Sequence, residues 1–116
     1  MGLRPVFGDA ALPSAARGAG TYVSGPVAAP GTGQDVLLCV HVSAVSGTPT
    51  LDASLEESND ASSWTAVPGS GIGQLTAAGN RVAFATLSKQ YVRVTSAVAG
   101  TTPSVTYRAA VMVIPE

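Results

Sequence analysis

The sequence predicts an all-β fold, an antiparallel, jelly-roll-like β-sandwich with an extended N-terminal arm. Three observations support it. Apolar and polar residues alternate at period two through most of the chain after Asp35. Glycine and proline recur between these runs, as they do in the turns of sandwiches and barrels. No stretch has helical spacing with start and stop signals, because Pro13 and Gly18 interrupt the alanine-rich residues 10–19.

The first part of the chain differs from the rest. Residues 1–34 are rich in glycine, alanine and proline, and their larger apolar groups have no steady spacing. Such a segment cannot fill a core by itself, so we expect residues 35–116 to form the sandwich domain. A solvated tail would waste Phe7, Tyr22 and Val23. We therefore favour an extended arm that lies on a neighbouring subunit over a floppy tail, with an edge strand over residues 21–28.

Seven or eight short strands are expected, each an alternating run bounded by turn residues. Apart from the edge strand in the arm, they are residues 36–42, 51–55, 64–67, 72–76, 81–86, 91–95 and 105–113. Residues 36–42 are apolar on one face and partly apolar on the other, which is typical of a central strand. Residues 51–55 alternate cleanly, so that strand should have one wet face. The polar residues 58–63 predict a tight turn.

A segment near the middle of the chain is echoed near its end. Residues 43–51 read SAVSGTPTL and residues 96–105 read SAVAGTTPSV, with one inserted threonine. Each copy should end a strand, turn through Gly-Thr-Pro and start another strand, because glycine supplies a positive φ and proline restarts an extended chain. The two predicted hairpins should lie at the same end of the sandwich, whether the echo is a duplication or convergence on a favourable turn.

Charge is scarce in this chain. Charged residues make up 11% of it and the net charge is −1, against the roughly 25% charged residues of typical soluble domains. The six basic residues are scattered, so no nucleic-acid partner is predicted. The apolar runs are far shorter than the ~20 residues of a membrane span, and no secretion signal is convincing. A neutral surface with little charge to keep copies apart indicates assembly.

Groups able to do chemistry are few. Cys39 and His41 are each the only residue of their type and share one face of a predicted strand, which simple alternation explains. Cys39 is expected to act as a small buried hydrophobe. The acids Asp52, Glu56, Glu57 and Asp60 are expected on a solvated face. We therefore predict no enzyme activity, no catalytic residues, no metal site and no cofactor.

The aromatic residues supply the candidate contact sites. Trp64 is the only tryptophan among six aromatic residues, and we expect it in the core or at a subunit interface. An exposed Trp64 or Tyr91 could instead stack on a sugar, which keeps a carbohydrate-binding β-sandwich module as an alternative. The candidate interface residues are Phe7, Tyr22, Val23, Trp64 and Tyr91.

Several segments resemble small virion proteins of tailed bacteriophages, of the head decoration or minor capsid type. The segments that carry this resemblance are residues 42–52, 57–64, 74–79, 91–94 and 98–106. It covers about residues 35–114 and consists of turns and strand starts. Ala61 departs from the pattern, which more often has glycine there, so the turn could be of another type.

The resemblance implies a β-sandwich bound to the outer surface of a phage capsid. Its partners would be the major capsid protein and copies of itself, as a homotrimer at local threefold positions, and it would stabilise the head. We therefore expect a location on the virion after synthesis in the host cytoplasm. A phage tail or baseplate component remains an alternative, since the same fold would serve there.

Overall fold

The computed structural model describes residues 4–5, 11–28 and 33–114. In this part of the chain there is no helix, and eight strands form one antiparallel sheet. The strands are β1 (Arg4–Pro5), β2 (Leu12–Arg17), β3 (Gly20–Val23), β4 (Val27–Ala28), β5 (Gln34–Ser58), β6 (Thr65–Ala66), β7 (Gly79–Leu87) and β8 (Tyr91–Val113). The all-β antiparallel prediction is confirmed.

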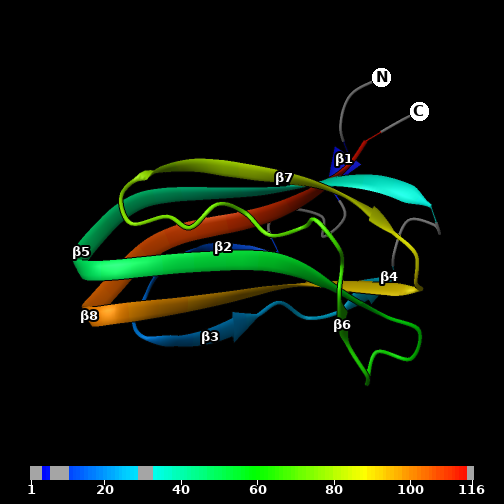
Figure 1. Ribbon diagram of the computed structural model, residues 1–116, viewed down its shortest axis with the longest axis horizontal. Helices are drawn as coiled ribbons and strands as arrows, with labels where there is room; N and C mark the ends of the chain where they lie inside the picture. Colours follow the sequence, from blue (N-terminus) through cyan, green and yellow to red (C-terminus); the bar gives the residue numbers. More distant parts are fainter. Residues whose placement is uncertain (1–3, 6–10, 29–32, 115–116) are drawn as a thin grey trace.

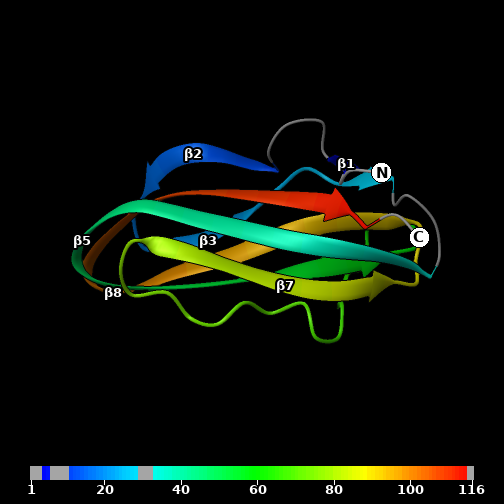
Figure 2. The same cartoon turned by 90° about the horizontal axis from the view of Figure 1, so that it is seen from above.

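Two long strands organise the sheet. β5 and β8 pair antiparallel along their whole length, from Val36 opposite Val113 to Ser58 opposite Tyr91. Both strands bend at the same end of the molecule, so that their two halves lie over one another (Figures 1 and 2). The result is one continuous sheet folded double. A jelly roll of two separate sheets is not confirmed.

The echoed segments form this bend. They were expected to be two hairpins, and that expectation is wrong. The two copies pair with each other, with Val45 opposite Val105 and Thr48 opposite Thr101. The register shifts between these pairs, where Gly47 on β5 faces two residues of β8, one of them supplied by the inserted threonine. The expectation that both copies lie at one end of the fold is met in the bend itself.

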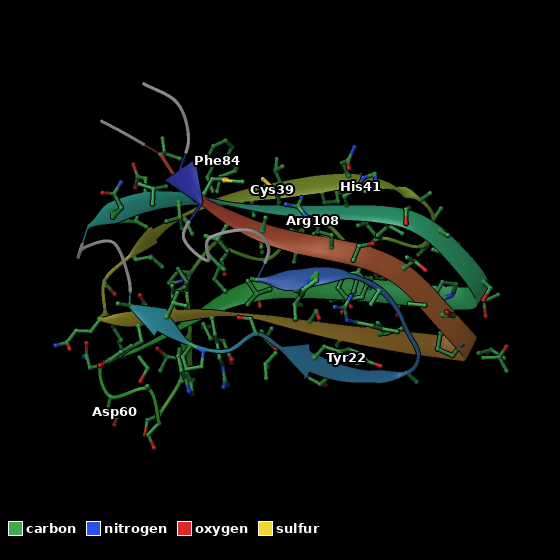
Figure 3. All side chains as sticks on the ribbon, turned by 180° about the vertical axis from the view of Figure 1, so that it is seen from behind. Tyr22, Cys39, His41, Asp60, Phe84 and Arg108 are labelled. Carbon is green, nitrogen blue, oxygen red and sulfur yellow. The ribbon has the colours of Figure 1, made fainter. Side chains whose placement is uncertain are left out.

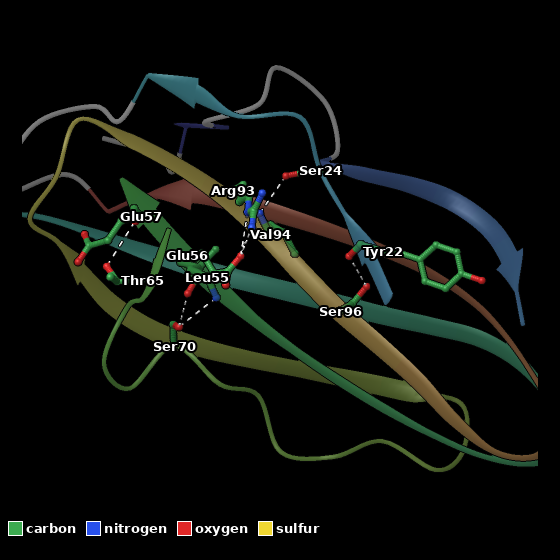
Figure 4. A network of polar contacts seen from close by, with 10 residues as sticks. All are labelled: Tyr22, Ser24, Leu55, Glu56, Glu57, Thr65, Ser70, Arg93, Val94 and Ser96. Carbon is green, nitrogen blue, oxygen red and sulfur yellow. Dashed lines mark hydrogen bonds and ion pairs between the residues drawn. The ribbon is translucent and has the colours of Figure 1, made fainter. Parts of the chain in front are cut away.

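The described part of the arm belongs to the chain's own sheet. β4, β3, β2 and β1 pair in turn with β8, from Tyr91 to Val113. Ser24 and Val94 are joined by two hydrogen bonds of 2.9 Å: the Ser24 N–H donates to the Val94 carbonyl, and the Val94 N–H donates to the Ser24 hydroxyl (Figure 4). The hydroxyl of Ser96 donates to the carbonyl of Tyr22 at 3.1 Å. The edge strand expected over residues 21–28 is present as β3 and β4.

The opposite edge of the sheet is built from residues 65–87. β7 pairs with the first half of β5, and β6 pairs with the second half. Beyond β6 the backbone stays on β5, because Val67 N–H donates to Leu55 at 3.0 Å and Ile72 N–H donates to Ala53 at 3.0 Å. The short strand expected around residues 64–67 is therefore confirmed, whereas residues 72–76 contribute a single bridge, from Leu75 to Leu51.

A single hydrophobic cluster lies between the two layers. It draws on every long element, because inward residues of β5, β7 and β8 alternate with outward ones. Its largest fully buried members are Tyr107, Leu38, Leu51, Leu55, Leu87, Val36, Val40, Val42, Val92, Val94, Val105 and Val111. Tyr107 brings a hydroxyl into this core, where it bonds the Ser96 hydroxyl at 2.6 Å.

Candidate functional site

The outer side of the layer that contains β7 carries exposed apolar side chains. Along β7 the small residues Ala83 and Ala85 face the core, whereas Val82 is 54% exposed and Phe84 is 66% exposed. β7 pairs with β5 so that Phe84 lies opposite Leu37 and Val82 lies opposite Cys39. Leu37 and Cys39 are half-buried. These four residues form a continuous apolar strip across two strands.

Polar side chains close this strip at both ends. Towards the chain termini, Asp35 lies opposite Thr86 and accepts a hydrogen bond from its hydroxyl at 2.6 Å. Towards the bend, His41 lies opposite Asn80, and the two side chains are hydrogen-bonded. We call these eight residues the β5–β7 face: Asp35, Leu37, Cys39, His41, Asn80, Val82, Phe84 and Thr86. Figure 3 shows Phe84, Cys39 and His41 following one another along it.

β8 borders the β5–β7 face on its other side. Arg108 lies opposite His41 and Met112 lies opposite Leu37. The face is thus acidic at the Asp35 end, apolar in the middle and bordered by the basic Arg108 at the His41 end. At the acidic end there is a hollow of about 200 Å³, lined by Asp35, Phe84, Ala85, Thr86 and Ile114.

Cys39 and His41 do share this face, but they do not form a reactive pair in the structure. His41 is exposed and bonds Asn80, not the thiol. Burial raises the pKa of the Cys39 thiol, and the nearby positive charge of Arg108 lowers it by less. A raised pKa disfavours the nucleophilic thiolate. Across residues 4–5, 11–28 and 33–114 no three metal-binding side chains gather.

The predicted interface residues are scattered over the fold. Phe7 lies outside the described residues. Tyr22 is half-buried, packs against the core and donates its hydroxyl to Gly18 at 2.8 Å. Val23 is 47% exposed on β3, and Tyr91 is half-buried at the start of β8. The structure does not bring these residues together into one site.

Trp64 is half-buried outside the core cluster. The guanidinium of Arg93 lies 4.4 Å from the centre of its ring, and Arg93 also forms an ion pair with Glu56 at 2.8 Å. One face of the indole is therefore covered by a cation. A groove of about 280 Å³ on the same layer is lined by Asp52, Ala53, Ser54, Gly71, Ile72, Thr95, Ser96 and Ala97. No aromatic ring lines that groove, so it offers a sugar no stacking platform.

The acidic residues expected on a solvated face are divided. Asp52 and Asp60 are exposed and Glu56 is half-buried, but Glu57 is buried, at 4% exposure. Its carboxylate accepts hydrogen bonds from the backbone N–H and the hydroxyl of Ser88, at 2.8 and 2.9 Å. The expectation is wrong for Glu57 because the turn that precedes β8 folds over its side chain.

Sequence reasoning missed that Val82 and Phe84 are exposed. Their alternation with alanines was visible, but large apolar residues on a strand are usually placed inside. Comparison with known proteins adds no assignment: no protein-family model matches the chain, and no curated protein matches it in sequence. The described residues include no helix long and apolar enough to cross a membrane.

Proposed function

We propose that this chain is a structural protein of a bacteriophage particle, of the head decoration or minor capsid type, which binds the capsid surface and stabilises the head. The observation that carries the proposal is the exposed Val82 and Phe84 pair on a chain with only 11% charged residues. Solvent-exposed apolar side chains that lie together on a neutral surface are typical of a contact site.

Two further features support a role in assembly. The sheet is closed along the outer edge of β8 by the chain's own arm, which leaves side-chain faces rather than that edge for contact. The resemblance of residues 35–114 to phage virion proteins favours the head. The homotrimer expected from the arm and from the resemblance is not part of this proposal, because the described residues of the arm pair with β8 of their own chain.

Cryo-electron microscopy of purified particles tests this proposal. We expect density for the chain on the outer head lattice, in contact with the major capsid protein. Absence of the chain from purified heads would contradict the proposal, and density confined to the region below the neck would favour the tail or baseplate alternative. Supplying a Phe84→Asp variant should reduce its occupancy, whereas Val23→Asp, the matched change at another exposed apolar residue, should not.

A further inference from the structure

We propose that the β5–β7 face is where two copies of this chain meet, face to face and related by a twofold axis. The inference rests on the proposed role in assembly and names the partner of the same face. It follows from the order of charged and apolar groups along the face, together with the hollow at its acidic end.

The face consists of four rows that run across the two strands. Antiparallel pairing sets each row, with one residue from β7 beside one from β5. From the chain termini towards the bend, the rows are Thr86 with Asp35, Phe84 with Leu37, Val82 with Cys39, and Asn80 with His41. The two inner rows are apolar and the two outer rows are polar. The last row lies beside a permanent cation, because His41 is opposite Arg108 on β8.

A twofold axis that runs across the strands, between the two inner rows, reverses this order in the second copy. The apolar rows then cover each other, with Phe84 opposite Val82 of the second copy. Asp35 comes to lie opposite His41 of the second copy and beside its Arg108. Because the contact is isologous, each favourable pairing occurs twice. Opposite charges at the border of an apolar contact fix its orientation.

The alternative twofold axis, parallel to the strands, is disfavoured by the same charges. It would lay each row over the same row of the second copy, so that both Asp35 carboxylates would lie at one end of the contact and both Arg108 side chains at the other. Like charges brought together in this way oppose association. The order of charges therefore selects the axis that runs across the strands.

The hollow at the acidic end supplies a complementary shape. It measures about 200 Å³ and includes Asp35, Phe84 and Thr86 of the β5–β7 face among its lining residues. With the axis across the strands, His41 of the second copy lies over this hollow. An imidazole ring can enter it and donate a hydrogen bond to the Asp35 carboxylate, so the same contact fills the hollow and gives the carboxylate a polar partner.

Sedimentation equilibrium of the whole chain in solution tests the pairing. We expect a mass twice the 11.5 kDa of the chain at tens of micromolar. Phe84→Asp should raise the dissociation constant at least about tenfold, as expected for loss of a central apolar contact. The control Val23→Asp should leave it within about twofold, because Val23 lies on β3, away from the β5–β7 face. A strict monomer, a trimer, or equal effects of the two variants would overturn the proposal.

Charge reversal tests the orientation. Asp35→Arg and Arg108→Glu should each weaken pairing, and the double variant should recover it, because each basic end again meets an acidic end. Failure of the double variant to recover, with both single variants folded by circular dichroism, would overturn the arrangement. These variants also replace the Phe84 test if Phe84→Asp does not fold.

Cross-linking provides an independent distance. Cys39 is the only cysteine, and in the proposed pair the two Cys39 Cα atoms are roughly 12 Å apart, from packed sheets ~10 Å apart and an offset of two residues. A short bis-maleimide should join two copies of the wild type, and Phe84→Asp should abolish the product at the same concentration. Equal amounts of product from the wild type and from Phe84→Asp would contradict this face.

The pairing and the proposed function can fail separately. If the chain is a monomer in solution and its Phe84→Asp variant is lost from phage heads, the proposed function stands and the proposed pairing is wrong. If the chain pairs in solution through Phe84 but is absent from purified particles, the proposed pairing stands and the proposed function is wrong.

Discussion

Gly47 and Gly100 lie at the same bend of the two long strands, and each backs onto a carbonyl group of the other strand. A Cβ atom on Gly47 would overlap the carbonyl oxygen of Thr102, and one on Gly100 would overlap that of Thr48. Both residues also have positive φ, 74° at Gly47 and 118° at Gly100. The close approach of the strands at the bend thus depends on two positions without side chains.

Gly100→Ala should destabilise the protein by about 2–4 kcal/mol, because it adds backbone strain to a steric overlap. Urea unfolding measures the loss. Gly25→Ala is the matched control, since an added Cβ meets nothing within 4 Å there, and it should change stability by no more than about 0.5 kcal/mol. Equal stability of the two variants would show that the bend does not need a glycine at this position.

The same glycines show where sequence reasoning stops. A positive φ followed by a proline marks a change of direction, and residues 43–51 and 96–105 both contain one. Local chemistry alone does not distinguish a hairpin from a bend in two paired strands. The difference lies in the partner, since each copy pairs with the other, from Leu51 opposite Val98 to Val45 opposite Val105. A non-local pairing leaves no signature in either segment.

The outer face of β7 was hidden for a related reason. Period two predicted the strand, but it left open which of its two faces is inside. From their size, Val82 and Phe84 would be expected in the core. The pairing with β5 instead turns Ala83 and Ala85 inward. By contrast, the alternation in residues 51–55 was sufficient, because Leu51 and Leu55 share the face opposite Asp52, which is exposed.

Tyr107 should make stability depend on alkaline pH. Burial raises the pKa of its hydroxyl above 10.0, although the Ser96 hydrogen bond and Arg17 lower it in part. The unfolded chain therefore ionises first. The contribution of Tyr107 to the free energy of unfolding is fully present below pH 10 and is lost as the pH rises through the higher pKa of the folded state. Urea unfolding between pH 8 and 11 measures this decline, which Tyr107→Phe should remove at a cost of about 1 kcal/mol at neutral pH.

Tyr91→Phe is the control for this experiment, because it removes a hydroxyl from a half-buried ring outside the core cluster. Its alkaline decline should match that of the wild type. If the decline persists in Tyr107→Phe, another group is responsible and the buried hydroxyl pair of Tyr107 and Ser96 is not the cause.

Asp60 should make stability depend on acidic pH. The backbone N–H groups of Ser63 and Ser62, at 2.9 Å each, and the Ser58 hydroxyl donate to one carboxylate oxygen. These bonds lower the pKa of Asp60 from 3.8 to about 2. The contribution of the ionised Asp60 to stability is therefore present above pH 3.8 and is lost as the pH falls through about 2.

Nuclear magnetic resonance of the Asp60 carboxyl carbon measures this pKa directly. Ser58→Ala removes one donor and should move the pKa upward, whereas Ser43→Ala, an exposed serine outside the turn, should leave it unchanged. An Asp60 that titrates near 3.8 in the wild type would mean that the turn is not held by its carboxylate in solution.

Ala61→Gly should stabilise the protein. Ala61 has φ of 60°, the left-handed conformation that glycine adopts at no steric cost, and its N–H is held by the Ser58 hydroxyl at 2.9 Å. A side chain costs roughly 1–2 kcal/mol in this region, and glycine brings about 0.5–1 kcal/mol of extra unfolded-state entropy. The net gain is therefore about 0.5–1 kcal/mol, measured by urea unfolding.

The turn thus has a backbone conformation at position 61 that suits glycine better than alanine. Ala77→Gly separates the relief of backbone strain from the entropic cost of glycine, because Ala77 is exposed and has no positive φ. It carries only the entropic penalty and should lower stability by about 0.5–1 kcal/mol. A loss of the same size in Ala61→Gly would show that the left-handed backbone at Ala61 costs nothing in solution.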